Sequence, residues 1–116
     1  ITEFGFNLSI GDDFDAGCGL KIIDCNEVSI GNNVTIGENV GIYTSNHAKD
    51  PKLRCDHWCS ELPIRIGNNV VIESNSVVLP GTIIEDNVWI RPGSVVLGRI
   101  EADSICAGDP ARRESK

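Results

Sequence analysis

Both histidines of this chain, His47 and His57, fall in one polar stretch, residues 43–63, which also carries Cys55 and Cys59. Imidazole and thiolate are common ligands of zinc, and alternate residues of an extended segment face the same side. Cys55, His57 and Cys59 would therefore share one side, but the sequence offers no obvious fourth ligand. We interpret the cluster as a loop with incidental thiols and expect no metal.

A six-residue period organises the rest of the chain and must position this stretch. Aliphatic or small side chains recur at this interval in three runs: Ile10, Ala16 and Ile22; Ile30, Ile36 and Ile42; and Ile66, Ile72, Val78, Ile84, Ile90 and Val96. Three residues after most of them stands Asn or Gly, which enter the left-handed region at little steric cost. These residues are Asn33, Asn39, Asn69, Asn75, Gly81, Asn87 and Gly93. Such self-similarity indicates a parallel β-helix.

Strand geometry converts the period into a prism. Side chains of a strand alternate between its two faces, so the first and fifth residues of a unit, such as Ile66 and Val70, both point inward. Three flat sides of about six residues complete a triangular coil, and coils stack about 4.8 Å apart. We therefore expect one all-β domain over residues 1–116, with a loop over 43–63 and a short C-terminal tail over 101–116.

Two interruptions of the period carry information. Between Lys21 and Ile30 the period slips by two residues, which predicts a bulged corner at residues 24–27. Residues 43–63 have no repeat character and end at Pro63. A long excursion from a regular solenoid is usually a functional loop.

Composition excludes several classes of protein. Ten Lys and Arg against 17 Asp and Glu give a net charge of −7, which argues against a nucleic-acid surface or an anionic membrane surface. The sequence has no apolar run long enough for a transmembrane helix. Five cysteines, an odd number without small-scaffold spacing, favour a reduced, cytoplasmic chain. We interpret Cys18, Cys25 and Cys106 as small packing residues.

Several stretches resemble the maltose, galactoside and nodulation-factor O-acetyltransferases of the hexapeptide-repeat family. They are 10–14 (IGDDF), 22–24 (IID), 28–34 (VSIGNNV), 42–47 (IYTSNH), 63–70 (PIRIGNNV), 78–81 (VLPG) and 107–111 (AGDPA). The resemblance covers nearly the whole chain in order. It implies left-handed coiling, an exception to the right-handed crossover rule. It also implies a homotrimer that transfers acetyl from acetyl-CoA to a hydroxyl, with active sites between neighbouring subunits.

The resemblance also assigns roles to residues. His47 matches the family's catalytic base. The reaction needs such a base, because a sugar hydroxyl attacks a thioester well only while a neutral imidazole takes its proton. Backbone N–H groups would hold the oxyanion. On the acetyl-CoA side the matching residues are Ser74 and Arg112, with Arg113 as a helper. On the acceptor side they are Gly17, Asp24 and Trp58; Trp58 could equally contact a neighbouring subunit or anchor the loop.

The chain departs from the family at several positions. Gly17 replaces an acceptor-binding Asn, and Cys25 replaces an acceptor carboxylate although Asp24 is kept. Val71 replaces the Trp beside the CoA site, and Gly98 replaces the Lys that meets the CoA phosphate.

These departures keep other functions open. One is a non-catalytic hexapeptide trimer that acts as a scaffold or binding module, and another is N-acetylation of an amino-sugar. A carbonic anhydrase-like metalloenzyme needs three histidine ligands, and this chain has two histidines.

The outer positions of the later units carry large or charged side chains. Trp89 is expected on an outer face, where we favour a subunit interface over a shelf for adenine. Glu73, Glu85 and Arg91 are expected at solvated corners.

Overall fold

The computed structural model describes residues 2–3, 7–44 and 62–114. The predictions for His47, Cys55, His57, Trp58 and Cys59 lie outside these residues.

Short strands and corners make up the whole of the described chain. In order they are β1 (Thr2–Glu3), β2 (Leu8–Ile10), β3 (Asp15–Ala16), β4 (Lys21–Ile23), β5 (Val28–Ile30), β6 (Thr35–Ile36), β7 (Gly41–Tyr43), β8 (Ile64–Ile66), β9 (Val71–Ile72), β10 (Val77–Val78), β11 (Ile83–Ile84), β12 (Trp89–Ile90), β13 (Val95–Val96), β14 (Arg99–Ile100), β15 (Ile105–Gly108) and β16 (Ala111–Arg113).

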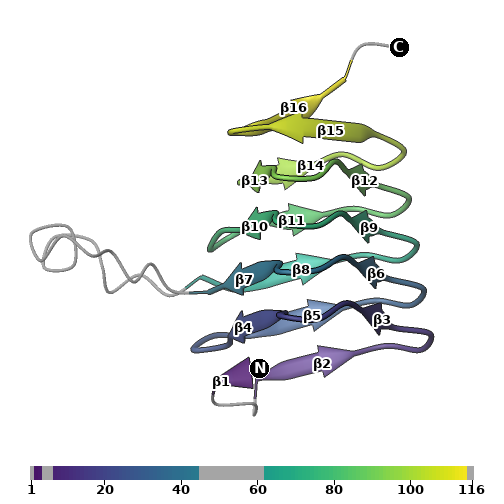
Figure 1. Ribbon diagram of the computed structural model, residues 1–116. Coiled ribbons are helices and arrows are strands. Elements are labelled where there is room, and N and C mark those ends of the chain that lie inside the picture. The colour runs from purple at the N-terminus through teal and green to yellow at the C-terminus, as the bar shows by residue number, and fades with distance from the viewer. Residues whose placement is uncertain (1, 4–6, 45–61, 115–116) are drawn as a thin grey trace, which may run out of the picture.

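Three sheets form the sides of a prism, and the coils stack from the N-terminal end to the C-terminal end (Figure 1). Sheet A contains β1, β4, β7, β10 and β13. Sheet B contains β2, β5, β8, β11 and β14, and sheet C contains β3, β6, β9, β12, β15 and β16. Each coil therefore runs from sheet A through sheet B to sheet C, which gives three columns of corners: AB, BC and CA. The prediction of an all-β fold with the architecture of a parallel β-helix is confirmed.

Strand register locates the predicted bulge. Lys21 pairs with Gly41, so this coil advances by 41 − 21 = 20 residues. Val77 pairs with Val95, so a later coil advances by 95 − 77 = 18 residues. The two additional residues lie at the AB corner between Ile23 and Val28, where the sequence predicted them.

The core is a stack of aliphatic side chains inside the prism. The members with the largest fully buried side chains come from all three sheets and their corners: Ile22, Ile36, Ile42, Ile64, Ile66, Ile72, Ile84, Ile90, Val28, Val34, Val40 and Val70. Ile66 and Val70 both point inward, as predicted. Ile10 is 40% exposed and lies in the first coil of the described chain.

The corners are fixed by residues with positive φ and by polar ladders. All seven Asn and Gly residues predicted for this conformation adopt it. Asn33 Nδ2 donates to Asn69 Oδ1 of the next coil at 3.2 Å, and Asn87 Nδ2 donates to Asp103 Oδ1 at 3.1 Å. In the same BC column, Asn68 Oδ1 accepts the backbone N–H of Asn32 at 2.8 Å. These bonds join successive coils at the edge where strands are absent.

The C-terminal segment continues the prism before it ends. β15 pairs in parallel with β12 and antiparallel with β16, so residues 105–113 form a hairpin on the last strand of sheet C. The segment predicted as a tail, 101–116, thus begins with a further corner and strand of the β-helix.

The cysteines differ from one another. Cys106 is buried in register with Ile90, which confirms its packing role. Cys25 is half-buried at the bulged corner. Cys18 is exposed at a CA corner, so its predicted role as a packing residue is wrong. As the second residue of its corner, Cys18 lies outside the aliphatic core.

Candidate functional site

The AB corner holds both described ends of the excursion. Thr44 is buried, donates from Oγ1 to the carbonyl of Ile23 at 2.7 Å, and accepts the N–H of Asn26 at 3.1 Å. The N–H of Leu62 donates to the carbonyl of Thr44 at 3.0 Å. The residues that flank 45–61 are therefore joined at one fixed point, and His47 follows Thr44 by three positions in the sequence.

Asp24 lies at the same corner, one coil earlier, with no exposed surface. Its Oδ2 accepts the N–H of Asn7 at 3.0 Å, and the Asn7 side-chain amide donates to the Asp24 carbonyl at 2.9 Å. Asp24 thus links Asn7, the residue before β2, to the bulged corner by hydrogen bonds. A role in acceptor binding stays a prediction.

Gly17 lies at a CA corner, at the other end of β4 from Asp24. Its N–H donates to the carbonyl of Ile36 at 2.8 Å. A Cβ at this position would come within 2.9 Å of Glu38 Cγ, so the next coil already fills the space beside it. The two acceptor-side candidates are therefore not brought together within one chain.

Ser74 also lies at a CA corner, at the exit of β9. Its hydroxyl accepts the N–H of Glu38 at 3.0 Å, and its carbonyl accepts the N–H of Gly93 at 2.9 Å. Ser74 is thus tied to the coils on both sides of it, which fixes the backbone that the resemblance places against CoA.

The two candidate arginines lie on the strand that ends sheet C. Arg112 pairs with Ala107 and Arg113 pairs with Cys106, and both arginines are exposed. Residues opposite one another in an antiparallel pair share a face. Arg113 therefore lies on the face of the buried Cys106, at the end of the prism, whereas Arg112 lies on the outer face.

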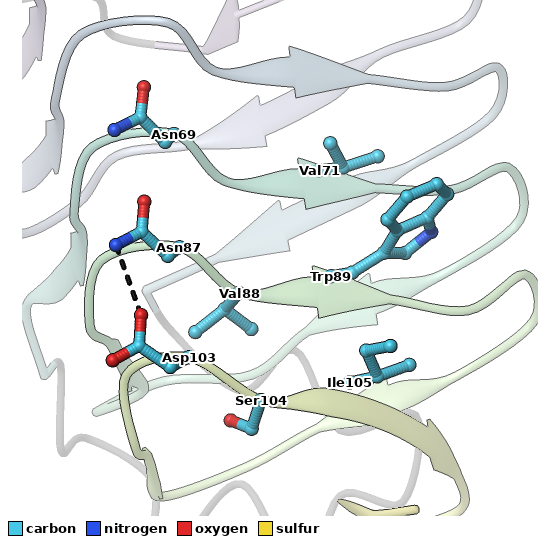
Figure 2. Close-up of a pocket in the computed structure, with 8 residues that line it drawn as sticks. All are labelled: Asn69, Val71, Asn87, Val88, Trp89, Asp103, Ser104 and Ile105. Carbon is cyan, nitrogen blue, oxygen red and sulfur yellow. Dashed lines mark hydrogen bonds between the residues drawn. The ribbon is translucent and has the colours of Figure 1, made fainter.

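The outer face of sheet C carries an apolar column that sequence reasoning identified only in part. Val71, Trp89 and Ile105 stand in register on three successive strands (Figure 2). Trp89 is 44% exposed, as predicted for an outer position, and Ile105 is 42% exposed. Together with Asn69, Asn87 and Asp103 they line a shallow hollow of about 350 Å³. The sequence could have revealed this column, because Val71, Trp89 and Ile105 are outward positions separated from one another by about one coil.

Charged side chains hold Trp89 in place. Its indole N–H donates to Glu73 Oε2 at 2.7 Å, and the Arg91 guanidinium carbon lies 5.8 Å from the ring centroid. Arg91 Nε also bonds Glu114 Oε1 at 3.2 Å. Glu73 and Arg91 were expected to be solvated residues at corners. In the structure Glu73 accepts a hydrogen bond from Trp89, and Arg91 pairs with Glu114. Because Val71 and Trp89 are paired, the indole lies beside the position where the resemblance has a Trp.

A second hollow, of about 520 Å³, lies on the outer face of sheet B around Arg65, Ile83 and Arg99. Arg99 Nε donates to Glu85 Oε2 at 2.7 Å, and the N–H of Ala102 donates to Glu85 Oε1 at 3.0 Å. The Arg99 hydrogen bond and then the Ala102 N–H hold the pKa of Glu85 below its ordinary value, against a smaller opposing effect of burial. Glu85 is therefore a corner residue that is paired with Arg99 rather than freely solvated.

Within residues 2–3, 7–44 and 62–114, no group of three or more His, Cys, Asp or Glu side chains is arranged to hold a metal ion. The same part of the chain contains no helix of the length and hydropathy needed to cross a membrane.

Comparison with family models identifies the repeats. Residues 63–100 match the model described as bacterial transferase hexapeptide (six repeats), and residues 27–45 match the hexapeptide repeat of succinyl-transferase. The chain belongs to the hexapeptide-repeat family. The family resemblance predicted from the sequence is thus confirmed.

Named relatives match along nearly the whole chain. A galactoside O-acetyltransferase of Escherichia coli is 40% identical over 110 residues, which are 95% of this chain and 54% of the relative. Nodulation protein L of Rhizobium meliloti is 36% identical over 110 residues, 95% of this chain and 60% of the relative. This chain spans only a little over half the length of these relatives.

Solved structures confirm the left-handed β-helix. A maltose O-acetyltransferase from Clostridium difficile superimposes with a TM-score of 0.87 at 35% identity, covering 99% of this chain and 62% of that one. A galactoside acetyltransferase in complex with coenzyme A superimposes with a TM-score of 0.90 at 38% identity, covering 99% of this chain and 57% of that one.

Proposed function

We propose that this protein is an acetyl-CoA-dependent O-acetyltransferase that acetylates a hydroxyl of a sugar or similar small acceptor, with His47 as general base. The observation that carries the proposal is the likeness of the prism to a galactoside acetyltransferase in complex with coenzyme A, at a TM-score of 0.90 and 38% identity. The E. coli galactoside O-acetyltransferase, 40% identical over 110 residues, supports the same reaction class.

The reaction needs one base and one anion-stabilising site. The His47 imidazole takes the proton of the acceptor hydroxyl as its oxygen attacks the thioester carbonyl. Backbone N–H groups stabilise the tetrahedral oxyanion. Collapse of this intermediate breaks the carbon–sulfur bond, and the imidazolium returns the proton to the leaving CoA thiolate. No covalent enzyme intermediate is formed.

A homotrimer fits the distribution of the candidate residues. Asp24 and the point from which residues 45–61 depart lie at the AB corner, whereas Gly17 and Ser74 lie at the CA corner. A second copy whose CA corner faces the AB corner of the first would unite the two sets at a shared site. Closed cyclic assemblies are the usual form of such repeated contacts. In this proposal Ser74, Arg112 and Arg113 serve acetyl-CoA, Asp24, Gly17 and Trp58 serve the acceptor, and the protein acts in the cytoplasm.

A non-catalytic trimer is the second candidate, because at one position where the chain departs from the family the backbone conformation disfavours the family's residue. Gly98 stands where the resemblance has a Lys, and its φ is +77°. A side chain other than Gly, Asn or Asp is strained in this region. This chain therefore could not regain the Lys without a change of the corner.

The test is release of free thiol from acetyl-CoA in the presence of a panel of sugars and amino-sugars. Acceptor-dependent release is expected from the wild type, with a loss of at least about 100-fold in His47→Ala, as for removal of a general base. His57→Ala, the same change in the same stretch, is the matched control and should retain activity. Binding of acetyl-CoA without release for any acceptor would favour the non-catalytic trimer.

A further inference from the structure

The exposed indole of Trp89 is a fixed surface rather than a freely moving side chain. Glu73 accepts its N–H at 2.7 Å, and the Arg91 guanidinium, itself paired with Glu114, lies over the ring with its carbon 5.8 Å from the centroid. Both contacts come from the chain itself, so the orientation of the ring is set before any ligand arrives. A ring held in this way loses little conformational entropy when a second planar group stacks on it.

Two arginines, Arg91 and Arg112, lie on the same face, together with the acidic side chains of Glu73, Asp103 and Glu114. Trp89 is in register with Ile105, and Arg112 pairs with Ala107, two residues along the same strand from Ile105. Because alternate residues of a strand share a face, Arg112 lies on the outer face with Trp89. The two residues are on strands separated by one intervening strand, so about 10 Å separates their strand axes.

The surroundings of Trp89 favour a small charged ligand over the subunit interface that we favoured from the sequence. The cores of protein interfaces are depleted of charged residues. Here the indole contacts Glu73 and Arg91 directly, and the hollow beside it is edged by Asn69, Asn87 and Asp103. A planar aromatic group with phosphates attached matches an indole shelf that has arginines at one end.

We propose that Trp89 is the stacking shelf for the adenine ring of acetyl-CoA, with Arg91 and Arg112 facing its phosphates. This inference rests on the proposed function and names the residues of this chain that would bind the nucleotide end of the co-substrate. Arg91 is paired with Glu114, whereas Arg112 has no ion pair within the part of the chain that the structure describes.

Calorimetric titration of the full chain tests the shelf with three probes: CoA, adenosine 3′,5′-diphosphate and pantetheine. Trp89→Leu is expected to weaken CoA and adenosine 3′,5′-diphosphate by about tenfold, within the range for base–aromatic stacking, and to leave pantetheine unchanged. Trp89→Phe, which keeps an aromatic face, should recover most of the affinity. Arg112→Gln should weaken both phosphate-bearing probes and make their binding less sensitive to salt.

Ile83→Ala is the matched control, because Ile83 is 43% exposed on the outer face of sheet B and lies at neither the AB nor the CA corner. Its affinities should equal those of the wild type. Unchanged CoA affinity in Trp89→Leu would overturn the proposed role of Trp89. The proposed function would still stand if the wild type transferred acetyl. A change of sedimentation in Trp89→Leu would instead make Trp89 an interface residue and also overturn the shelf. No binding of CoA by the wild type would overturn both proposals.

Discussion

The division of each strand into inward and outward residues predicts very different costs for one and the same substitution. Ile72 is fully buried inside the prism, whereas Ile83 is 43% exposed on the outer face of sheet B. Ile72→Ala removes three buried carbon groups, which costs about 2.4 kcal/mol of transfer free energy at about 0.8 kcal/mol each. A residual cavity of about 40 Å³ adds about 1 kcal/mol. The expected loss is therefore about 3 kcal/mol.

Ile83→Ala is the matched control, with an expected loss of about 1 kcal/mol or less because much of its side chain already meets water. Both variants are compared with the wild type by urea unfolding, at one protein concentration because assembly shifts apparent stability by mass action. Equal losses, or a larger loss for Ile83→Ala, would refute the register. A slip of one residue exchanges the two faces of a strand.

Three further predictions concern the corners. Asn69→Val should lower the free energy of unfolding by about 1–2 kcal/mol more than Asn69→Gly, because φ is 57° there and a β-branched residue is strained; equal values in urea unfolding would contradict this. Asp24→Ala should cost about 2 kcal/mol, since the N–H of Asn7 loses its buried acceptor, and a wild-type unfolding midpoint would count against that bond. The lowered pKa of Glu85 means that its pairing with Arg99 contributes fully above its ordinary pKa of 4.5 and is lost as the pH falls through the lower folded value. The unfolding free energy of Glu85→Gln should therefore depend less on pH below 4.5 than that of the wild type, and identical pH profiles would exclude the effect.

Much of the fold could be predicted because each coil repeats the same local requirements. An inward aliphatic residue and a corner residue with positive φ recur at fixed spacing, and residues such as Ile66 and Asn69 occupy these positions in the structure. The bulged corner at 24–27 followed from the same count. The pattern says less about the C-terminal end, because the hairpin of β15 and β16 is specified by a reversal of the chain and not by the repeat.

The candidate site could be predicted only residue by residue. The sequence pattern does not say that Asp24 is fully buried and accepts the N–H of Asn7, since a carboxylate is usually exposed. It also gives no account of Glu73 as the partner of Trp89, because these residues lie 16 positions apart and meet only when the coils stack. Contacts between coils depend on side-chain orientation, which a six-residue period leaves open.

The most direct test of the account is analysis of the product formed from acetyl-CoA and the best acceptor of the panel. The account predicts an acetylated acceptor whose ester is cleaved by hydroxylamine, detected by mass spectrometry with the wild type and absent with His47→Ala. An acetyl group that resists hydroxylamine would indicate N-acetylation of an amino-sugar. Equal product from wild type and His47→Ala, or no product from any acceptor, would contradict the proposal that His47 drives O-acetyl transfer.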